Sequence, residues 1–466
     1  METRSNEFLG TEKINRLMRR FAAPCVVSLL VGALYNIVDQ IFIANADYLG
    51  SVGNAANTVV FPMTVIALAI ATMLGDGCCA FVSLRLGEKN PQDARRGVGA
   101  AVTALVLGSL LLTAIYLLFM DPILTLFGAR VSAETFRLSR EYFSYIALGV
   151  PFYMFGQALN PIVRSDGSPR FAMVSLLAGA LTNCVLDPLF IYGFRWGMMG
   201  AAAATVAGQV ISALMALWYL FRMKAVRLDR DCFKPRWSVL RRILPLGMTS
   251  FLSQISIVIS MAAVLNMVRH YGALDPVFGQ EQYAQIPTAV IGIVMKFFQI
   301  VMSVAIGLAA GCIPIVGYNM GAGNGARVQK VLVRLMLAEA LTGLIATVIF
   351  ESFPLPLIGV FGAANESVYY TQFAVFAIRV FLSMTVLSCV NKGAFIFLQS
   401  MGRAWPSTAL STLREIVFGV GLPLILPRIW GLYGILYFMP AADVLTATAA
   451  AVVLLCAHRE LERAAA

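Results

Sequence analysis

Residues 21–44 read FAAPCVVSLLVGALYNIVDQIFIA, a run of 24 residues in which Asp39 is the one acidic or basic side chain. About twenty consecutive apolar residues are long enough to cross a bilayer as an α-helix. Because no water reaches the backbone in the bilayer core, only a helix or a closed barrel satisfies its hydrogen bonds there. This stretch therefore predicts a transmembrane helix, with one carboxylate that needs an explanation.

The rest of the chain has the same character. Its 466 residues are 59% hydrophobic and 13% charged, with a mean hydropathy of +0.80. Soluble chains are roughly 45–50% apolar and about 25% charged. A soluble fold cannot bury so much apolar surface, so the sequence predicts an all-α polytopic membrane protein.

Charge and chemistry exclude several functions. A net charge of +11 suggests nucleic acid in a soluble protein, but basic loops of a membrane protein set its topology and contact anionic lipid. Two His and eight Cys without a CxxC pair form no recognisable metal site, and no nucleophile–base pair is apparent. We therefore expect no nucleic-acid partner, no cofactor and no enzymatic activity.

Apolar runs between charged or turn-forming segments predict twelve transmembrane helices. They span residues 21–44, 53–84, 96–120, 134–158, 170–192, 198–221, 240–268, 283–310, 328–350, 366–390, 405–426 and 432–457. With both termini in the cytoplasm, 26 of the 35 Lys and Arg residues, including Arg164 and Lys392, fall in inner segments. Six fall in outer loops and three within spans. This bias agrees with the positive-inside rule and supports the register.

The second half of the chain repeats the first at an offset of 234 or 235 residues. Matching pairs are Leu74 and Leu308, Gly77 and Gly311, Gly87 and Gly321, Pro188 and Pro423, and Trp196 and Trp430. The repeat predicts two pseudo-symmetric six-helix lobes, residues 1–221 and 240–466, joined by a cytoplasmic basic loop at 222–239. Transporters built from such repeats hold substrate between the halves and alternate by rocking. Retention of the repeat for folding alone is the alternative.

Asp39 is the clearest functional candidate, because an ionisable group near the bilayer centre costs roughly 2.5–3.5 kcal/mol on insertion scales. Tyr35 and Asn36 precede it by four and three residues and share its helical face, so we expect them to line a substrate cavity. A carboxylate that reaches the outer interface is the alternative.

A second carboxylate, Asp187, lies four residues after Asn183 and directly before Pro188, which weakens the helical hydrogen bonds there. Thr205 begins the next span at a similar depth. Oxygen ligands of this kind can hold Na⁺ or share a proton, so these residues and Asp39 form a candidate cation site.

Further charged residues interrupt other spans, and we expect most of them to form structural pairs such as Arg414 with Asp443. An adaptable apolar cavity is a weaker hypothesis, for which packing is the alternative. Its candidate residues are Met154, Phe155, Met173, Lys296 and Phe297.

Stretches in both halves resemble those of the multidrug and toxic compound extrusion (MATE) transporters, in particular the DinF/MepA-like branch. They are Pro24–Asp39, Leu86–Asn90, Arg164–Gly167, Asn183–Ile191, Gly197–Ala201, Pro314–Gly323 and Gln399–Gly402. The resemblance implies twelve helices in two lobes that export amphipathic, often cationic compounds in exchange for H⁺ or Na⁺.

Position by position, Asp39 resembles the first-helix carboxylate of that branch. Asn183, Asp187 and Thr205 resemble the remainder of its amino-lobe cation site, with Ala201 supplying a backbone carbonyl. Pro24 resembles the proline at which the first helix is proposed to bend. NorM-like members place an acidic coupling residue in the seventh helix, but residues 240–268 contain no carboxylate. The resemblance therefore places coupling in the amino-terminal lobe.

The sequence thus predicts a secondary active multidrug exporter that works as an antiporter by alternating access. We expect a monomeric, multi-pass protein of the bacterial inner membrane whose partners are the lipid bilayer and toxic organic cations or drugs. Whether H⁺ or Na⁺ is the coupling ion stays open. The alternative is a flippase for lipid-linked precursors, which would require Lys296, Arg379 and Arg414 to face the central cleft.

Overall fold

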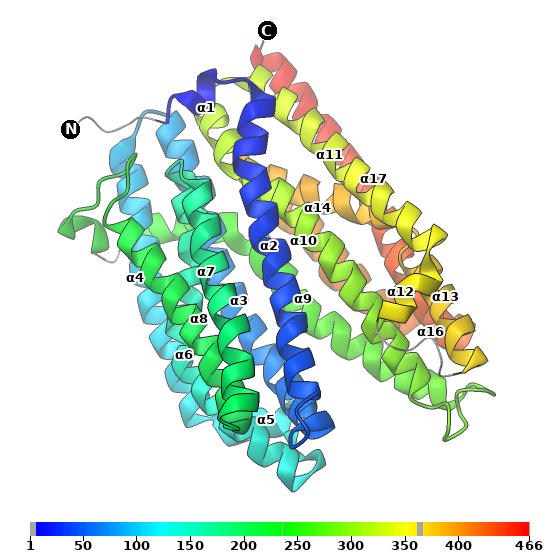
Figure 1. Cartoon of the computed structure of the whole chain (residues 1–466). Helices are drawn as coiled ribbons and strands as arrows, with labels where there is room; N and C mark the ends of the chain where they lie inside the picture. The colour runs from blue at the N-terminus through cyan, green and yellow to red at the C-terminus, as the bar shows by residue number, and fades with distance from the viewer. Residues whose placement is uncertain (1–5, 235, 361–366, 466) are drawn as a thin grey trace.

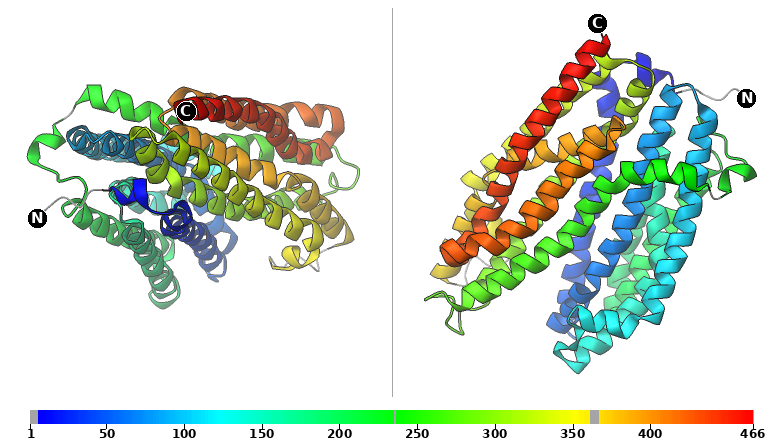
Figure 2. Two further views of the ribbon diagram at one scale, coloured as in Figure 1. Left: turned by 90° about the horizontal axis from the view of Figure 1, so that it is seen from above. Right: turned by 180° about the vertical axis from the view of Figure 1, so that it is seen from behind.

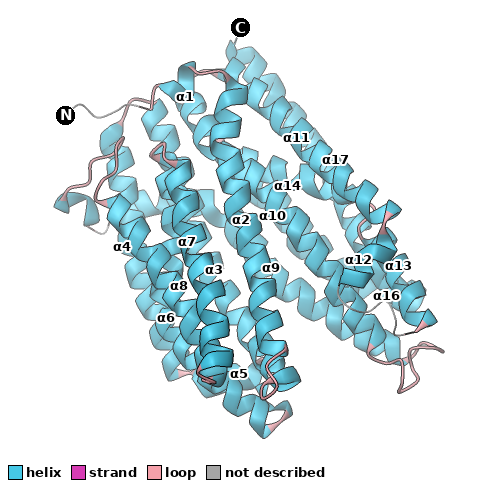
Figure 3. Ribbon diagram, in the orientation of Figure 1, coloured by secondary structure: helices cyan, strands magenta, loops and turns pink. Residues whose placement is uncertain are grey.

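The computed structural model describes residues 6–234, 236–360 and 367–465, and every regular element in these ranges is a helix (Figure 3). The first lobe contains α1 (Phe8–Thr11), α2 (Ile14–Ala44), α3 (Gly50–Gly87), α4 (Pro91–Leu118), α5 (Met120–Leu126), η1 (Ala129–Val131), α6 (Ala133–Ser165), α7 (Pro169–Pro188), η2 (Leu189–Gly193) and α8 (Gly197–Leu220). The short η3 (Arg230–Phe233) lies in the connection to the second lobe.

The second lobe repeats this order with more interruptions. It contains α9 (Trp237–Ala273), α10 (Ile286–Gly321), α11 (Gly325–Ser352), α12 (Pro354–Val360), α13 (Val368–Phe381), α14 (Thr385–Ser400), α15 (Ala404–Thr412), η4 (Leu413–Phe418), α16 (Gly419–Gly434), η5 (Ile435–Tyr437) and α17 (Phe438–Ala465).

The described helices provide twelve spans, as predicted. Nine single helices are long and apolar enough to cross a membrane, and α13 with α14 forms another span that bends by 41°. The continuous helical stretch Ala404–Glu462 has 59 residues, more than twice the length that one span needs, and its backbone breaks at Trp430 and Gly431. Gly431 has φ of 60°, a conformation that a glycine tolerates, so the chain reverses there and forms two spans.

Local sequence signals explain where several helices begin. The Asn90 side chain accepts a hydrogen bond from the Asp93 backbone nitrogen, and Pro91 occupies the first helical position of α4. Ser132 caps α6 in the same way by accepting from the backbone nitrogen of Thr135. These caps satisfy amide groups that lack a partner in the first turn.

The two lobes lie side by side, and both termini lie at the same end of the molecule, which we call the terminal end (Figure 1). The ribbons of the lobes approach one another toward the terminal end and diverge toward the opposite end (Figures 1 and 2). Helix α2 packs against α10, and α3 packs against α9 and α10, so these four helices form the lobe interface.

Glycines allow close approach across this interface. A Cβ atom at Gly307 would lie 2.6 Å from the Cα of Val26, and one at Gly311 would lie 2.5 Å from the Cα of Ala22. A Cβ atom at Gly247 would overlap the backbone of Met73. Side chains larger than hydrogen therefore cannot be placed here without separating the lobes.

Two basic residues that the sequence assigned to inner loops are buried within helices, so their assignment to loops was wrong. Lys392 lies within α14 and is buried, and Arg164 is buried in the last turn of α6. The tenth span therefore continues to Ser400, beyond its predicted end at residue 390. Both cations are tolerated because carboxylates pair with them.

Candidate functional site

Three helices of the first lobe bring four predicted residues together. Asn183 and Asp187 lie one turn apart on α7, and the Asn183 side-chain nitrogen donates to Asp187 Oδ1 at 3.3 Å. The same nitrogen donates to Thr205 Oγ1 of α8 at 3.2 Å. Asp39 of α2 lies within hydrogen-bonding reach of the Asp187 carboxyl group. Ala201, which is completely buried, precedes Thr205 by one turn of α8.

Several oxygens of this cluster have no partner. The buried atoms Asp39 Oδ1, Asn183 Oδ1 and Asp187 Oδ2 accept no hydrogen bond from any described residue. Asp39 is 7% exposed and Asp187 is completely buried, and neither forms an ion pair with a described Lys, Arg or His. Two buried carboxylates without a positive partner are costly. A bound cation would remove this cost: Na⁺ prefers hard oxygen ligands, and a proton can be shared between adjacent carboxyls.

Proline shapes the backbone beside the cluster. Pro188 has no amide hydrogen, so it cannot donate to the carbonyl of Cys184 one turn earlier. The residues that follow, Leu189–Gly193, form a π-helical turn instead of continuing the α-helix. Single π turns inside helices often occur at functional sites, and this one follows directly after Asp187 and Pro188.

The sequence reasoning missed Tyr142 of α6. Its side chain is 4% exposed and lies near Thr205 and both carboxylates. Ser139 precedes it by three residues on the same helical face and is completely buried. A polar pair at this spacing within an apolar span was the available signal.

The residues predicted to line a substrate cavity lie in different places. Tyr35 is half-buried near Asp39, whereas the exposed Asn36 donates to the carbonyl oxygen of Gly32 in its own helix at 2.8 Å. Met154 is completely buried in the core of the first lobe, and Phe155 packs against that core.

The remaining members of that set are partly exposed. Met173 lies near the start of α7 in the first lobe. Lys296 and Phe297 belong to α10 of the second lobe, where the Phe297 ring lies 6.1 Å from that of Phe350.

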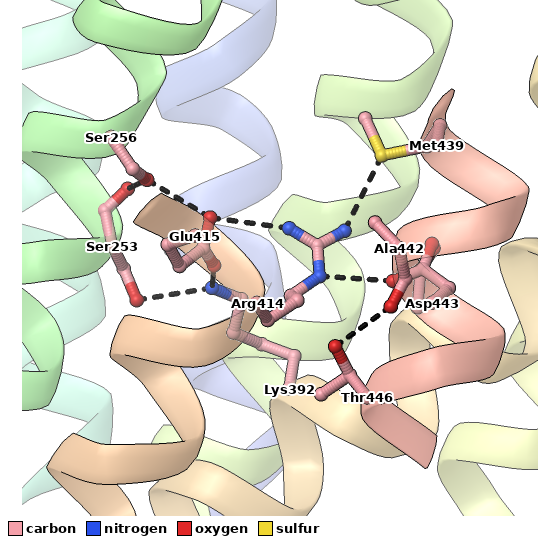
Figure 4. Close-up of polar contacts among 10 residues, drawn as sticks. Ser253, Ser256, Lys392, Arg414, Glu415, Met439, Ala442, Asp443 and Thr446 are labelled. Carbon is pink, nitrogen blue, oxygen red and sulfur yellow. Dashed lines mark hydrogen bonds and ion pairs between the residues drawn. The ribbon is translucent and has the colours of Figure 1, made fainter. Parts of the chain in front are cut away.

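The second lobe contains a different kind of polar cluster (Figure 4). Arg414 donates from Nε to Asp443 Oδ1 at 2.9 Å and from Nη1 to Glu415 Oε2 at 3.1 Å. Lys392 pairs with the other carboxylate oxygen of Glu415, and Ser256 donates to Glu415 Oε2 at 2.9 Å. Further contacts come from Ser253, Ser388, Asn391 and Met439.

The charges of this cluster cancel, because two cations face two carboxylates. The predicted pair of Arg414 with Asp443 is confirmed. Each ionised group also has several hydrogen-bond partners, which is what a buried ionic network needs to be tolerated. The first-lobe cluster therefore differs from this one in having negative charge without compensation.

Two of the three cations on which the flippase alternative relied are paired with carboxylates. Arg414 is buried between Asp443 and Glu415. Arg379 is half-exposed and lies 3.8 Å from Glu351. Arg414 is therefore neutralised inside the second lobe, and Arg379 has an acidic neighbour at the surface.

Comparison with known proteins gives a consistent result. The MatE family model matches residues 24–189 and again residues 249–425, one match in each half. The multidrug export protein MepA of Staphylococcus aureus strain MSSA476 is 24% identical over 444 residues, which are 94% of this chain and 93% of MepA. The structure of the MATE multidrug transporter DinF-BH in complex with a dye has a TM-score of 0.87 and 31% identity, covering 98% of both chains.

The fold also matches the outward-facing conformation of a multidrug resistance MATE family transporter of the MOP superfamily. That structure gives a TM-score of 0.88 at 22% identity and covers 100% of this chain and 99% of its own. The two matches of the family model together span well over half of the sequence. This chain therefore belongs to the MATE family of multidrug transporters and is of the DinF/MepA type.

Proposed function

We propose that this protein is a secondary active antiporter that exports amphipathic organic cations in exchange for H⁺ or Na⁺. The observation that carries the proposal is the uncompensated pair Asp39 and Asp187. Each has a buried oxygen without a hydrogen-bond partner among the described residues, as has Asn183, whose amide also donates to Thr205. MepA is named as a multidrug export protein, and DinF-BH was solved with a dye bound, which supports drugs as substrates.

Each residue has a proposed role. Asp39 and Asp187 carry the negative charge that attracts the ion. Asn183 and Thr205 orient the carboxylates and supply neutral oxygens, and the Ala201 carbonyl is a further ligand. Binding of one cation removes the cost of two buried carboxylates in contact, and this change in free energy favours one arrangement of α2 over another.

Pro24 is the proposed bend of α2. The Ser28 hydroxyl donates to the Pro24 carbonyl oxygen at 2.8 Å, a contact that often bends helices. Pro24 also lies between Ala22 and Val26, which contact Gly311 and Gly307 of the other lobe. A bend there moves the outer part of α2, which carries Asp39, relative to the second lobe.

We propose that the lobes, residues 1–221 and 240–466, rock about this interface while residues 222–239 connect them. The drug would bind between the lobes near Tyr35, with Asn36, Met154, Phe155, Met173, Lys296 and Phe297 as further candidates. The protein would act as a monomer in the bacterial inner membrane with both termini in the cytoplasm.

The energy that one coupling ion supplies depends on the charge of the drug. A single charge crossing about 150 mV gains roughly 3.5 kcal/mol, at about 2.3 kcal/mol per 100 mV. At about 1.36 kcal/mol per tenfold, this supports a gradient of about 300-fold for an uncharged drug. For a monovalent cationic drug, exchange of one charge for one is electroneutral, so the concentration gradient of the coupling ion supplies the energy.

The test uses the full-length protein in vesicles loaded with ethidium. A pH gradient and a Na⁺ gradient are imposed separately, and efflux is followed by fluorescence. Acceleration of efflux by either gradient supports antiport and identifies the ion. A folded protein that responds to neither gradient contradicts the proposal.

A further inference from the structure

A cavity of about 900 Å³ opens at the terminal end of the first lobe, between the start of α2 and the adjacent ends of α7 and α8. Six of its lining residues are cationic: Arg16, Arg19, Arg20, Arg170, Arg222 and Lys224. All six are exposed. The proposed cation and drug sites do not use this cavity.

Most of this positive charge is uncompensated. Glu12 approaches Arg16 at 3.9 Å and Arg20 at 3.6 Å. Among the described residues, Arg19, Arg170 and Arg222 form no ion pair. Asp166 is buried near the cavity, where it accepts from the backbone nitrogens of Lys224 and Ala225. Six cations against the two carboxylates Glu12 and Asp166 leave a net charge of +4.

Three aromatic residues, Phe171, Trp218 and Tyr219, also line the cavity. The rings of Phe171 and Trp218 stack at 5.8 Å, and Tyr219 lies 4.8 Å from Phe171. The Arg222 guanidinium lies 4.4 Å above the Trp218 ring, and Trp218 is 50% exposed. Trp and Arg side chains arranged in this way are typical of the level at which lipid headgroups meet the acyl chains.

The matching position of the second lobe is built differently. Trp405 stands 235 positions after Arg170, and the neighbouring Arg403 is paired with Glu460. At this repeat position the first lobe therefore has an arginine without an ion-pair partner among the described residues, whereas the second lobe has a tryptophan and the adjacent Arg403 is paired.

We propose that this cavity binds the phosphate-bearing headgroup of an anionic membrane phospholipid such as phosphatidylglycerol. The arginines contact the phosphate oxygens, because guanidinium groups match them with paired hydrogen bonds. The glycerol and upper acyl chain lie against Trp218 and Phe171. A free phosphate presents the same oxygens, but the exposed aromatic surface beside the arginines favours a ligand with an apolar part.

Quenching of Trp218 by brominated lipids tests the proposal. A full-length variant keeps Trp218 and carries Phe at Trp196, Trp237, Trp405 and Trp430. It is reconstituted with brominated phosphatidylglycerol or with brominated phosphatidylcholine at equal mole fractions. We expect brominated phosphatidylglycerol to quench Trp218 more strongly than brominated phosphatidylcholine does. In a second variant that keeps only Trp405, we expect the two lipids to quench equally.

Charge variants identify the cavity as the cause. Each basic residue near an anionic surface contributes about a fivefold gain in affinity. Arg170→Gln with Arg222→Gln should therefore weaken the preference for the anionic lipid by up to about 25-fold. Lys330→Gln with Arg459→Gln, which removes two exposed cations from the second lobe, should leave it unchanged. Size-exclusion profiles and efflux of each variant show that it is folded.

Two results would overturn the proposal. Equal quenching of Trp218 by both lipids would show that the cavity does not select the anionic headgroup. Loss of the preference on addition of millimolar inorganic phosphate would assign the cavity to a soluble phosphate instead.

Discussion

The Ser250 hydroxyl of α9 donates to Asp76 Oδ2 of α3 at 2.9 Å, and this hydrogen bond joins the two lobes. Asp76 also pairs with Arg164 of its own lobe at 3.5 Å. Gln399 of α14, in the second lobe, donates to the Ser250 hydroxyl at 3.3 Å. The contact lies beside the close packing of Gly77 against the backbone of α9. It therefore stabilises the arrangement in which the lobes are closed at the terminal end.

Ser250→Ala should shift the equilibrium away from the arrangement in which the lobes are closed at the terminal end, toward one in which they are separated there. Loss of one hydrogen bond of about 1 kcal/mol corresponds to about a fivefold change in populations. Spin labels at the exposed positions Arg96 and Lys330 report the separation of the lobes at the terminal end, in a Cys456→Ser background. We expect a larger fraction of long distances. Ser303→Ala, which removes a hydroxyl that donates to the Gln299 carbonyl oxygen of its own helix, is the control. An unchanged distance distribution in Ser250→Ala would contradict this role.

Glu415→Gln should destabilise the second lobe. The substitution leaves Lys392 and Arg414 with the single carboxylate of Asp443, and breaking a buried ion pair costs about 3–5 kcal/mol. Thermal unfolding in detergent measures the effect. Joint replacement of Lys392 and Glu415 by Met removes both charges and should cost much less. If the single variant melts at the wild-type temperature, the network does not carry the stability assigned to it.

The sequence was sufficient to predict the membrane fold and the number of spans, because apolar length and the Lys/Arg bias are local properties. The repeat offset was sufficient to relate the two halves. Lys392 was misplaced because a lysine beside Asn391 looks like the end of a span. Its burial depends on Glu415, which is 23 positions away in sequence, and no local pattern shows that pairing.

The candidate cation site was predictable only for the residues that stand out in the local sequence. Asp39 and Asp187 were noticeable as carboxylates in apolar spans, and Asn183 as their neighbour on one helical face. Tyr142 carries no charge, so its place beside Thr205 became visible only when α6 and α8 were packed together. Likewise, the basic cavity is assembled from three helix ends that are far apart in the chain.

Thr205→Val should weaken coupling, whereas Thr205→Ser should preserve it. Valine has nearly the same shape but cannot accept the hydrogen bond from Asn183, so the amide loses one of its two partners. An unsatisfied buried group costs about 1–3 kcal/mol, which predicts a loss of roughly fivefold or more in apparent ion affinity. The ion concentration that gives half-maximal efflux measures this. Equal values for the Val and Ser variants would exclude a role for the hydroxyl.

Pro24→Ala should slow transport without destabilising the protein. Alanine restores the amide hydrogen that the helix lacks at this position and favours a straight α2. We expect slower ethidium efflux with unchanged drug binding and a melting temperature that does not fall. Pro62→Ala, in the interior of α3, is the control for replacing a proline in a first-lobe helix. Wild-type efflux by Pro24→Ala would show that a bend at this residue is not needed.

Gradient-driven efflux by carboxylate variants tests the central claim most directly. Asp39→Asn and Asp187→Asn keep the shape of the site but remove the charge that a cation would neutralise. Asp121→Asn, whose exposed carboxylate lies 3.2 Å from Arg140 near the start of α5, is the matched control. In vesicles loaded with ethidium, we predict that both site variants lose efflux driven by the coupling ion, while the control retains it. Full efflux by Asp39→Asn and Asp187→Asn would contradict coupling through the first lobe.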